Sequence, residues 1–244
     1  MNDLEHLENY TNKEIYAQVL LYVYDFIPVK SGLTNEEYDI EIIKKLKFSN
    51  IRDNERLRSC IDLIEDTECA IVEYYTDGLC VKQNSLGEKY LRLYGILNAV
   101  SLQIEAIIEL IELFKVPNKK TLKKDLKALK ISQIRNKIGS HTVKYIDNTT
   151  GKEVIDSYRV TQTSLSKSGR KIAISSIFFE GEEINLPQIL NEYNNLSSEI
   201  LKEICIKAIF SLFKNDSEDR RTIIKHFSFA TERVFTYQDL KRLV

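Results

Sequence analysis

The feature that most constrains this chain is an apolar stripe between Gly87 and Phe114. Apolar residues recur there at alternating intervals of four and three, which is the period of one face of an α-helix. The stripe consists of Leu93, Leu97, Val100, Ile104, Ile107, Ile111 and Phe114. A helix of this length has to bury its apolar face against other elements, so it forms the centre of the fold that we expect.

Composition favours helices for the rest of the chain as well. The 244 residues include only 8 Gly and 3 Pro, too few turn formers for a β-sandwich. Thr34 followed by Glu37 is a capping box that starts a second helix, and Pro187 opens a last one. The helices that we expect are residues 3–27, 34–47, 52–76, 87–114, 121–130, 132–138 and a long one from 187. The sequence therefore predicts one mainly α domain spanning residues 1–244.

The pattern changes to that of strands after His141. Residues 142–146, 153–163 and 170–181 are rich in β-branched and aromatic residues and are separated by turn sequences, which predicts a small antiparallel β insertion. The expected divisions of the chain are an N-terminal helical part (1–84), core helices (85–141), the β insertion (142–184) and C-terminal helices (185–244).

Charge is distributed unevenly along the chain. The formal net charge is -1, which excludes a protein coated in positive charge. Residues 1–77 carry 17 acidic against 8 basic residues, whereas residues 119–144 carry nine Lys or Arg against Asp125 alone. Any contact with nucleic acid is therefore expected at that basic segment.

Other sequence features narrow the class of protein. Neither a membrane span nor a signal peptide is visible, so we expect a cytoplasmic protein without membrane contacts. The cysteines, Cys60, Cys69, Cys80 and Cys205, have no metal-ligand or redox spacing and are expected to be buried free thiols. We expect no metal ion and no cofactor.

The basic segment ends in the most informative motif. Arg135 is followed by Asn136 and, six positions later, by His141, with apolar residues and a Gly between them. This arrangement resembles the signature of HEPN domains (higher eukaryotes and prokaryotes nucleotide-binding). Upstream, Tyr94-Gly95-Ile96-Leu97-Asn98-Ala99 and Gln103-Ile104-Glu105-Ala106 resemble a second pattern of a subgroup of these domains, with Asn98 in place of Gln and Glu105 in place of Asp.

The resemblance implies a HEPN-like helical bundle and a metal-independent endoribonuclease, a hydrolase of toxin–antitoxin or antiviral defence systems. RNA cleavage of that kind needs a proton-transfer group and a cation at the phosphate. His141 suits the first role because imidazole titrates near neutral pH, and the Arg135 guanidinium suits the second. The resemblance adds Asn136 as an orienting residue and Glu105 as a site carboxylate.

The lysines before and after the motif are expected to bind RNA. Six of them lie between residues 119 and 130 and leave Leu122, Leu126 and Leu129 for the core. Their position next to Arg135 favours an electrostatic track for RNA, and a plain solvated helix face is the alternative. The RNA-binding residues that we expect are Lys123, Lys124, Lys127, Lys137 and Lys144.

The spacing of the motif bears on oligomeric state. On an ideal helix, Arg135 and His141 lie roughly 120° apart around the axis and ~9 Å apart along it. They do not share a face, so one phosphate is reached more easily when two copies pair about a two-fold axis. We therefore expect a homodimer. The resemblance also implies an antitoxin or defence-system partner.

Three interpretations stay open at the level of sequence. The first is the ribonuclease. The second is a non-catalytic HEPN module that binds nucleotide or RNA, or that only dimerises. The third is a helical immunity or interaction protein, in which Arg135 and His141 are incidental and Glu105 belongs to a solvent-facing polar stripe.

Overall fold

The fold was analysed in a computed structural model, which describes residues 10–25, 32–81, 84–139, 145–146, 150–151, 153–154, 158–176, 181–212 and 221. The chain divides into two compact units. The first comprises residues 1–65, 106–119 and 198–244, and the second comprises residues 66–105 and 120–197.

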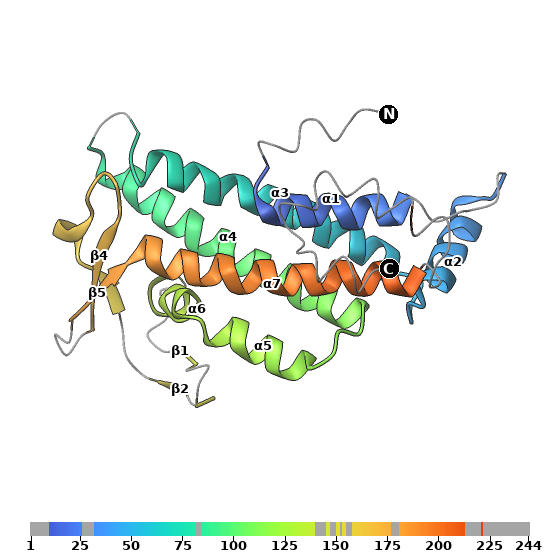
Figure 1. Ribbon diagram of the computed structural model, residues 1–244. Coiled ribbons are helices and arrows are strands. Elements are labelled where there is room, and N and C mark those ends of the chain that lie inside the picture. Colours follow the sequence, from blue (N-terminus) through green and yellow to red (C-terminus); the bar gives the residue numbers. More distant parts are fainter. Residues whose placement is uncertain are drawn as a thin grey trace. The chain divides into compact units, whose positions relative to one another are not determined.

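The described residues are mainly helical with a small antiparallel β portion, as predicted (Figure 1). The helices are α1 (Asn12–Asp25), α2 (Asn35–Leu46), α3 (Asp53–Asp77), α4 (Leu86–Leu113), α5 (Lys119–Ala128), α6 (Lys130–Ile134) and α7 (Leu186–Leu212), with a π-helical turn at Arg135–Gly139 and a 3-10 turn at Gln162–Ser164. The strands are β1 (Tyr145–Ile146), β2 (Glu153–Val154), β3 (Tyr158–Val160), β4 (Lys171–Ser176) and β5 (Gly181–Asn185).

Capping residues explain where the first two helices begin. Thr34 accepts from the Glu37 N–H, and the Glu37 side chain accepts from the Thr34 N–H, so the predicted capping box of α2 is confirmed. A second box joins Thr11 and Glu14. Because Thr11 caps α1, the helix begins at Asn12, and the predicted helical start at residue 3 is wrong for residues 10 and 11.

The predicted apolar stripe is confirmed as the buried face of α4. All seven of its residues, from Leu93 to Phe114, are at most 5% exposed. The stripe contributes to the core of both units, since α4 passes from the second unit into the first at Ala106. In the first unit, Phe114 at its end packs edge to face on Phe48, with the ring centroids 5.6 Å apart.

The β portion differs from the prediction in detail. It forms two sheets, β1 paired with β2, and a three-stranded antiparallel sheet in the order β3-β4-β5. The predicted strand at residues 153–163 is divided between β2, β3 and the 3-10 turn. Strand β5, with the sequence GEEIN, was not predicted, because its polar residues carry no strand pattern of their own. It forms by pairing with β4, where Ile172 lies opposite Ile184.

The structure bears on two further expectations about the chain. No described helix is both long enough and apolar enough to cross a membrane. Cys60, Cys80 and Cys205 are buried free thiols as predicted, but Cys69 is exposed, so the prediction is wrong for that residue. Burial, together with the nearby charge of Glu109, raises the pKa of Cys60 to about 12 and keeps its thiol protonated.

A buried polar network ties three helices together within the second unit. The Gln103 amide on α4 donates to Thr67 Oγ1 at 3.0 Å and to Glu68 Oε2 at 3.2 Å, both on α3. Its carbonyl accepts from the Tyr193 hydroxyl of α7 at 2.5 Å. Burial and the charge of Glu68 raise the pKa of Tyr193 well above its ordinary value, so this hydroxyl remains a donor.

This network makes a prediction about stability. Replacing Gln103 with Leu fills a similar volume but removes the group that both Tyr193 and Glu68 bond. We expect Gln103→Leu to lower the free energy of unfolding by about 1–3 kcal/mol in urea titrations. The matched change Gln188→Leu, at an exposed position of α7, should stay within about 0.5 kcal/mol of the wild type. Equal stability of the two variants would contradict a structural role for Gln103.

Candidate functional site

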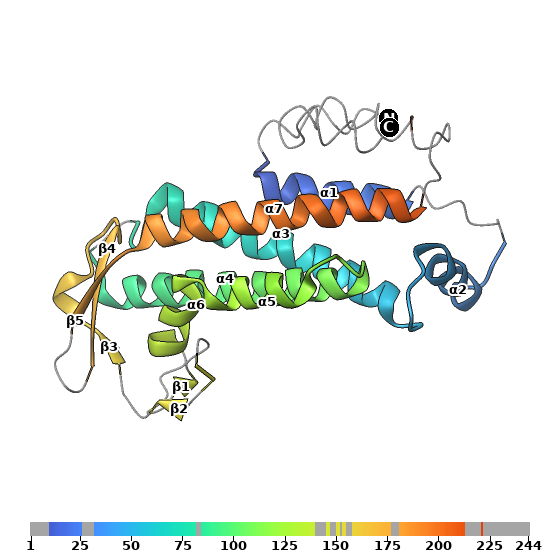
Figure 2. The ribbon, with the colours of Figure 1, turned by 60° about the horizontal axis from the view of Figure 1, so that its bottom comes forward.

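The motif residues lie on a helical segment that is fixed to α5. The Ser132 hydroxyl donates to Leu126 O at 3.2 Å, and the Gln133 amide donates to Ala128 O at 3.1 Å. These bonds satisfy carbonyls at the end of α5 and turn the chain sharply into α6. Figure 2 shows α6 between α5 and the pair β1-β2, so the motif occupies the junction between the helices and the β portion of the second unit.

The helix changes type at the motif. It is α-helical from Lys130 to Ile134 and π-helical over Arg135–Gly139. Ile131, Ile134 and Ile138 are all at most 1% exposed, so the apolar side of the segment is buried across the change of helix type. The predicted helix 132–138 is thus helical throughout, but the segment begins at Lys130 and changes type at Arg135. The preceding helix, predicted over 121–130, ends at Ala128. π turns are rare and occur frequently at functional sites.

Arg135 and Asn136 are the motif residues that the structure brings together. Both are half-buried, and Arg135 Nη1 donates to Asn136 Oδ1 over a long 3.4 Å. Within the described part of the chain, no carboxylate forms an ion pair with Arg135. A guanidinium held in this way keeps donors available for an external anion.

Glu182 of β5 lies close to the two lysines on either side of Arg135. Its carboxylate pairs with Lys130 and lies 3.9 Å from Lys137 Nζ. The Lys137 ammonium also stands 4.4 Å from the centroid of the Tyr158 ring, and its side chain is only 15% exposed. The expected RNA-binding residue Lys137 therefore lies close to a carboxylate of its own unit, whereas Arg135 forms no ion pair with any described residue.

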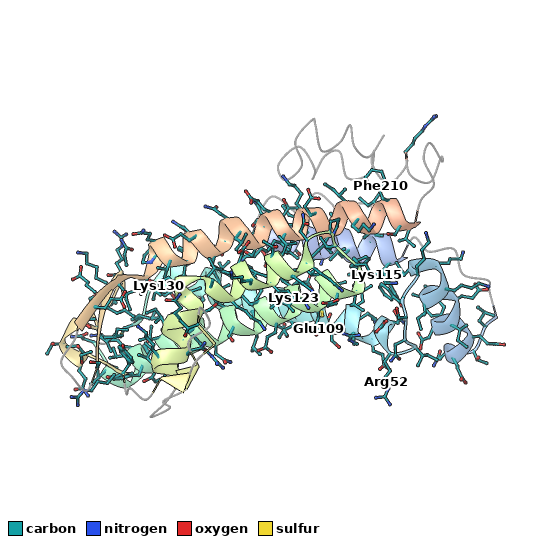
Figure 3. The ribbon with its side chains drawn as sticks, turned by 90° about the horizontal axis from the view of Figure 1, so that it is seen from below. Arg52, Glu109, Lys115, Lys123, Lys130 and Phe210 are labelled. Carbon is teal, nitrogen blue, oxygen red and sulfur yellow. The ribbon has the colours of Figure 1, made fainter. Side chains whose placement is uncertain are left out.

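The lysines of α5 differ in exposure. Lys124 and Lys127 are exposed, Lys123 is half-buried, and Leu126 is completely buried on the opposite side. Figure 3 shows Lys123 on α5 and Lys130 at the start of α6. Leu122 and Leu129 are half-buried, so only Leu126 of the three expected core leucines lies fully in the core.

The second sequence pattern separates into two different environments. Gln103 is completely buried in the polar network, whereas Glu105, two residues later, is exposed. Among the described residues, Glu105 forms neither a hydrogen bond nor an ion pair with Arg135. The structure therefore places Glu105 on the surface of α4, with no described link to the motif.

Several expected residues lie outside the described part of the chain. His141 and Lys144 are among them, as are the other two histidines, His6 and His226. Within the residues that the structure describes, no group of three or more His, Cys, Asp or Glu side chains is arranged to hold a metal ion.

Two residues near the motif were missed from the sequence, Glu182 and Tyr158. Glu182 is separated from Lys137 by 45 positions, and only the pairing of β5 with β4 places it there. No local pattern in the sequence could have indicated this contact.

Comparison of the chain with protein-family models, with curated proteins and with solved structures finds no match in any of the three. Membership of the HEPN family and the division into a single domain with four parts stay predictions. The chemistry of the site therefore has to be inferred from its own residues.

The pairing at Glu182 makes a prediction about stability. Its partners are partly exposed, so the change Glu182→Gln should lower the free energy of unfolding by no more than about 1 kcal/mol. Most of this loss should vanish at 1 M NaCl, where the Debye length is about 3 Å. Glu192→Gln, at an exposed position of α7, is the matched control. A loss that salt leaves unchanged would show that Glu182 acts through packing instead.

Proposed function

We propose that this protein is a metal-independent endoribonuclease in which Arg135 binds the phosphate and His141 transfers the proton. The observation that carries this proposal is the pattern of ion pairing at the motif. Glu182 pairs with Lys130 and lies 3.9 Å from Lys137 Nζ, whereas Arg135 pairs with no carboxylate among the described residues. A planar, permanently charged guanidinium without a carboxylate partner suits a phosphodiester, because it can donate two parallel hydrogen bonds to the phosphate oxygens.

The proposed reaction uses the 2′-hydroxyl of the RNA as nucleophile. His141 takes the 2′-hydroxyl proton as the 2′-oxygen forms a bond to phosphorus. The bond from phosphorus to the 5′-oxygen then breaks, and His141 returns the proton to that oxygen. The products are a 2′,3′-cyclic phosphate and a 5′-hydroxyl. Arg135 stabilises the charge of the pentacoordinate phosphorus, and Asn136 orients the guanidinium.

The wider setting of the reaction is inferred from the resemblance of the motif to HEPN domains. This resemblance supports a cytoplasmic toxin or antiphage-defence nuclease that acts as a homodimer. An antitoxin or another defence-system partner would restrain it. In the homodimer that we propose, Arg135 of one copy and His141 of the other act on the same phosphate.

A second candidate is an RNA-binding module without catalytic activity. The exposed Lys124 and Lys127 on α5 favour it, because surface lysines attract the phosphate backbone whether or not cleavage occurs. Binding without cleavage by the wild-type protein would select this candidate.

The catalytic assignment is tested by single substitutions. Wild-type protein should cleave single-stranded RNA in the presence of EDTA, and Arg135→Ala and His141→Ala should each lower the rate at least about 100-fold. His6→Ala is the matched histidine control and should cleave like the wild type, and circular dichroism checks that the variants fold. Equal cleavage by wild type and His141→Ala would overturn the assignment.

The shared site is tested by mixing two inactive variants. When Arg135→Ala and His141→Ala proteins exchange subunits at equal amounts, half of the dimers should be mixed, and each mixed dimer should contain one intact pair. We expect recovery of about a quarter of the wild-type rate in a gel-based cleavage assay. Mixed dimers, verified by native mass spectrometry, that show no recovery would mean that both residues act within one copy.

A further inference from the structure

The loop that joins β3 to β4 is held from inside the second unit. Every second backbone carbonyl of its central part accepts a hydrogen bond. The donors are the Lys89 ammonium to Leu165 O at 2.6 Å, the Leu79 N–H to Lys167 O at 2.9 Å and the Tyr74 hydroxyl to Gly169 O at 3.2 Å. The side chains of residues 166, 167, 168 and 170 are exposed around these anchored carbonyls, whereas Leu165 is buried.

One of these hydrogen bonds requires the burial of a charged group, the Lys89 ammonium. Lys89 is only 6% exposed, and within the described part of the chain its ammonium has a single hydrogen-bond partner, Leu165 O. Burial of an ammonium group is unfavourable unless its hydrogen bonds compensate, and a Met or Leu would fill the same space without that penalty. The placement of Lys89 is therefore explained by its hold on the loop.

Two glycines allow the loop to approach the end of α3 closely. Gly78 has φ +70°, and a Cβ there would lie 2.8 Å from both Lys167 O and Ser168 O. Gly169 has φ +64°, and its Cβ would lie 2.3 Å from the side chain of Leu79. Any other residue would force the two segments apart, so the loop has a fixed position in its unit.

The outward side of this fixed loop is basic. Residues 158–176 contain four Lys or Arg and no Asp or Glu. The exposed residues at the tip are Ser166, Lys167, Ser168, Arg170 and Lys171. Lys171 pairs with Glu183 at 2.8 Å, whereas Lys167 and Arg170 form no ion pair with any described residue. Two cations thus face solvent on a rigid support, beside the Ser166 and Ser168 hydroxyls, which lie 3.3 Å apart and hydrogen-bond each other.

We propose that this basic loop, residues 166–171, binds the phosphate backbone of single-stranded RNA. The inference rests on the proposed function and names a second contact for the same substrate. Lys167 and Arg170 supply charge, and the bonded pair of Ser166 and Ser168 hydroxyls keeps one donor of the kind that commonly contacts phosphates. Residues 159–176 contain no aromatic side chain on which a base could stack, so the contact is independent of sequence.

The length of β4 indicates how long an RNA has to be to contact both Arg135 and the basic loop. Tyr158, against which Lys137 packs, pairs with Ser176, and β4 runs from there back to Lys171. Five steps along a strand span about 17 Å. A stacked strand advances by about 3.4 Å per nucleotide, so β4 alone spans several nucleotides. We therefore expect a trinucleotide to reach only one of the two contacts.

The test measures RNA binding by the full chain in a His141→Ala background, which prevents cleavage. Lys167 and Arg170 are both changed to Glu, and the probes are fluorescein-labelled oligouridylates of 12 and 3 nucleotides. Lys44→Glu with Arg52→Glu is the matched control, because both residues are exposed in the first unit and the change in net charge is the same. Figure 3 shows Arg52.

We expect the loop variant to lose at least tenfold in affinity for the 12-mer, with an unchanged affinity for the 3-mer. Because two phosphate contacts are removed, the slope of log affinity against log salt should fall by about 1.4. The control variant should bind both oligonucleotides like the parent. Polyglutamate of the same charge should not displace the 12-mer from the parent protein.

Three results would overturn the inference. They are unchanged binding of the 12-mer by the loop variant, an equal loss in the control variant, and displacement by polyglutamate, which would assign the loop to acidic polymers in general. Its failure is distinguishable from that of the ribonuclease proposal. If the wild-type protein does not cleave RNA but the loop variant binds RNA more weakly than its parent, the loop inference holds and the ribonuclease proposal fails. If RNA is cleaved but the loop variant binds it as tightly as its parent, only the ribonuclease proposal holds.

Discussion

The second unit depends on a single buried amide. The Gln103 N–H groups donate to side chains of α3, and its carbonyl accepts from α7. One side chain therefore fixes the register of three helices at a point where apolar packing alone would allow them to slide. Such a network is stabilising only when every member is satisfied. The same side chain begins the Gln103–Ala106 part of the upstream sequence pattern. Its burial explains why a Gln occurs there, as a residue that holds helices together.

The site is positioned by the elements around it. The three buried isoleucines hold the segment from Lys130 to Gly139, and the π turn lies where the chain leaves the helices for the strands. Glu182 then lies close to Lys130 and Lys137 but forms no ion pair with Arg135. One carboxylate balances one charge, so the folded unit keeps most of the cations of the basic segment seen in the sequence. The basic loop adds two more on a support that is equally rigid.

Local signals explain what could be predicted from the sequence. The four-three spacing of apolar residues is sufficient for α4, and the pair Thr34 and Glu37 is sufficient for the start of α2. The same kind of signal was present at Thr11 and Glu14 but was overlooked. Strand β5 and the role of Glu182 could not be predicted, because each arises from pairing with residues distant in sequence. The π turn at Arg135–Gly139 was not predicted either, because the apolar spacing there is that of an ordinary α-helix.

The candidate site was predicted in part. Arg135 and Asn136 lie together as the motif indicates, whereas Glu105 is exposed and has no described link to them. The sequence predicts that Lys137 binds RNA, but in the folded unit its ammonium group lies close to Glu182 and the Tyr158 ring. A count of charges along a chain cannot distinguish a paired cation from one kept for a ligand. Only the positions of the carboxylates make that distinction.

The central claim is that the 2′-hydroxyl of RNA is the nucleophile and that Arg135 and His141 assist it. The most direct measurement is mass spectrometry of the ends produced when the wild-type protein cleaves a defined RNA in EDTA. Our account requires 2′,3′-cyclic phosphate and 5′-hydroxyl ends, and an RNA with a single 2′-deoxynucleotide at the cleaved position should resist. Ends with a 3′-hydroxyl and a 5′-phosphate, or cleavage at the deoxynucleotide, would contradict it.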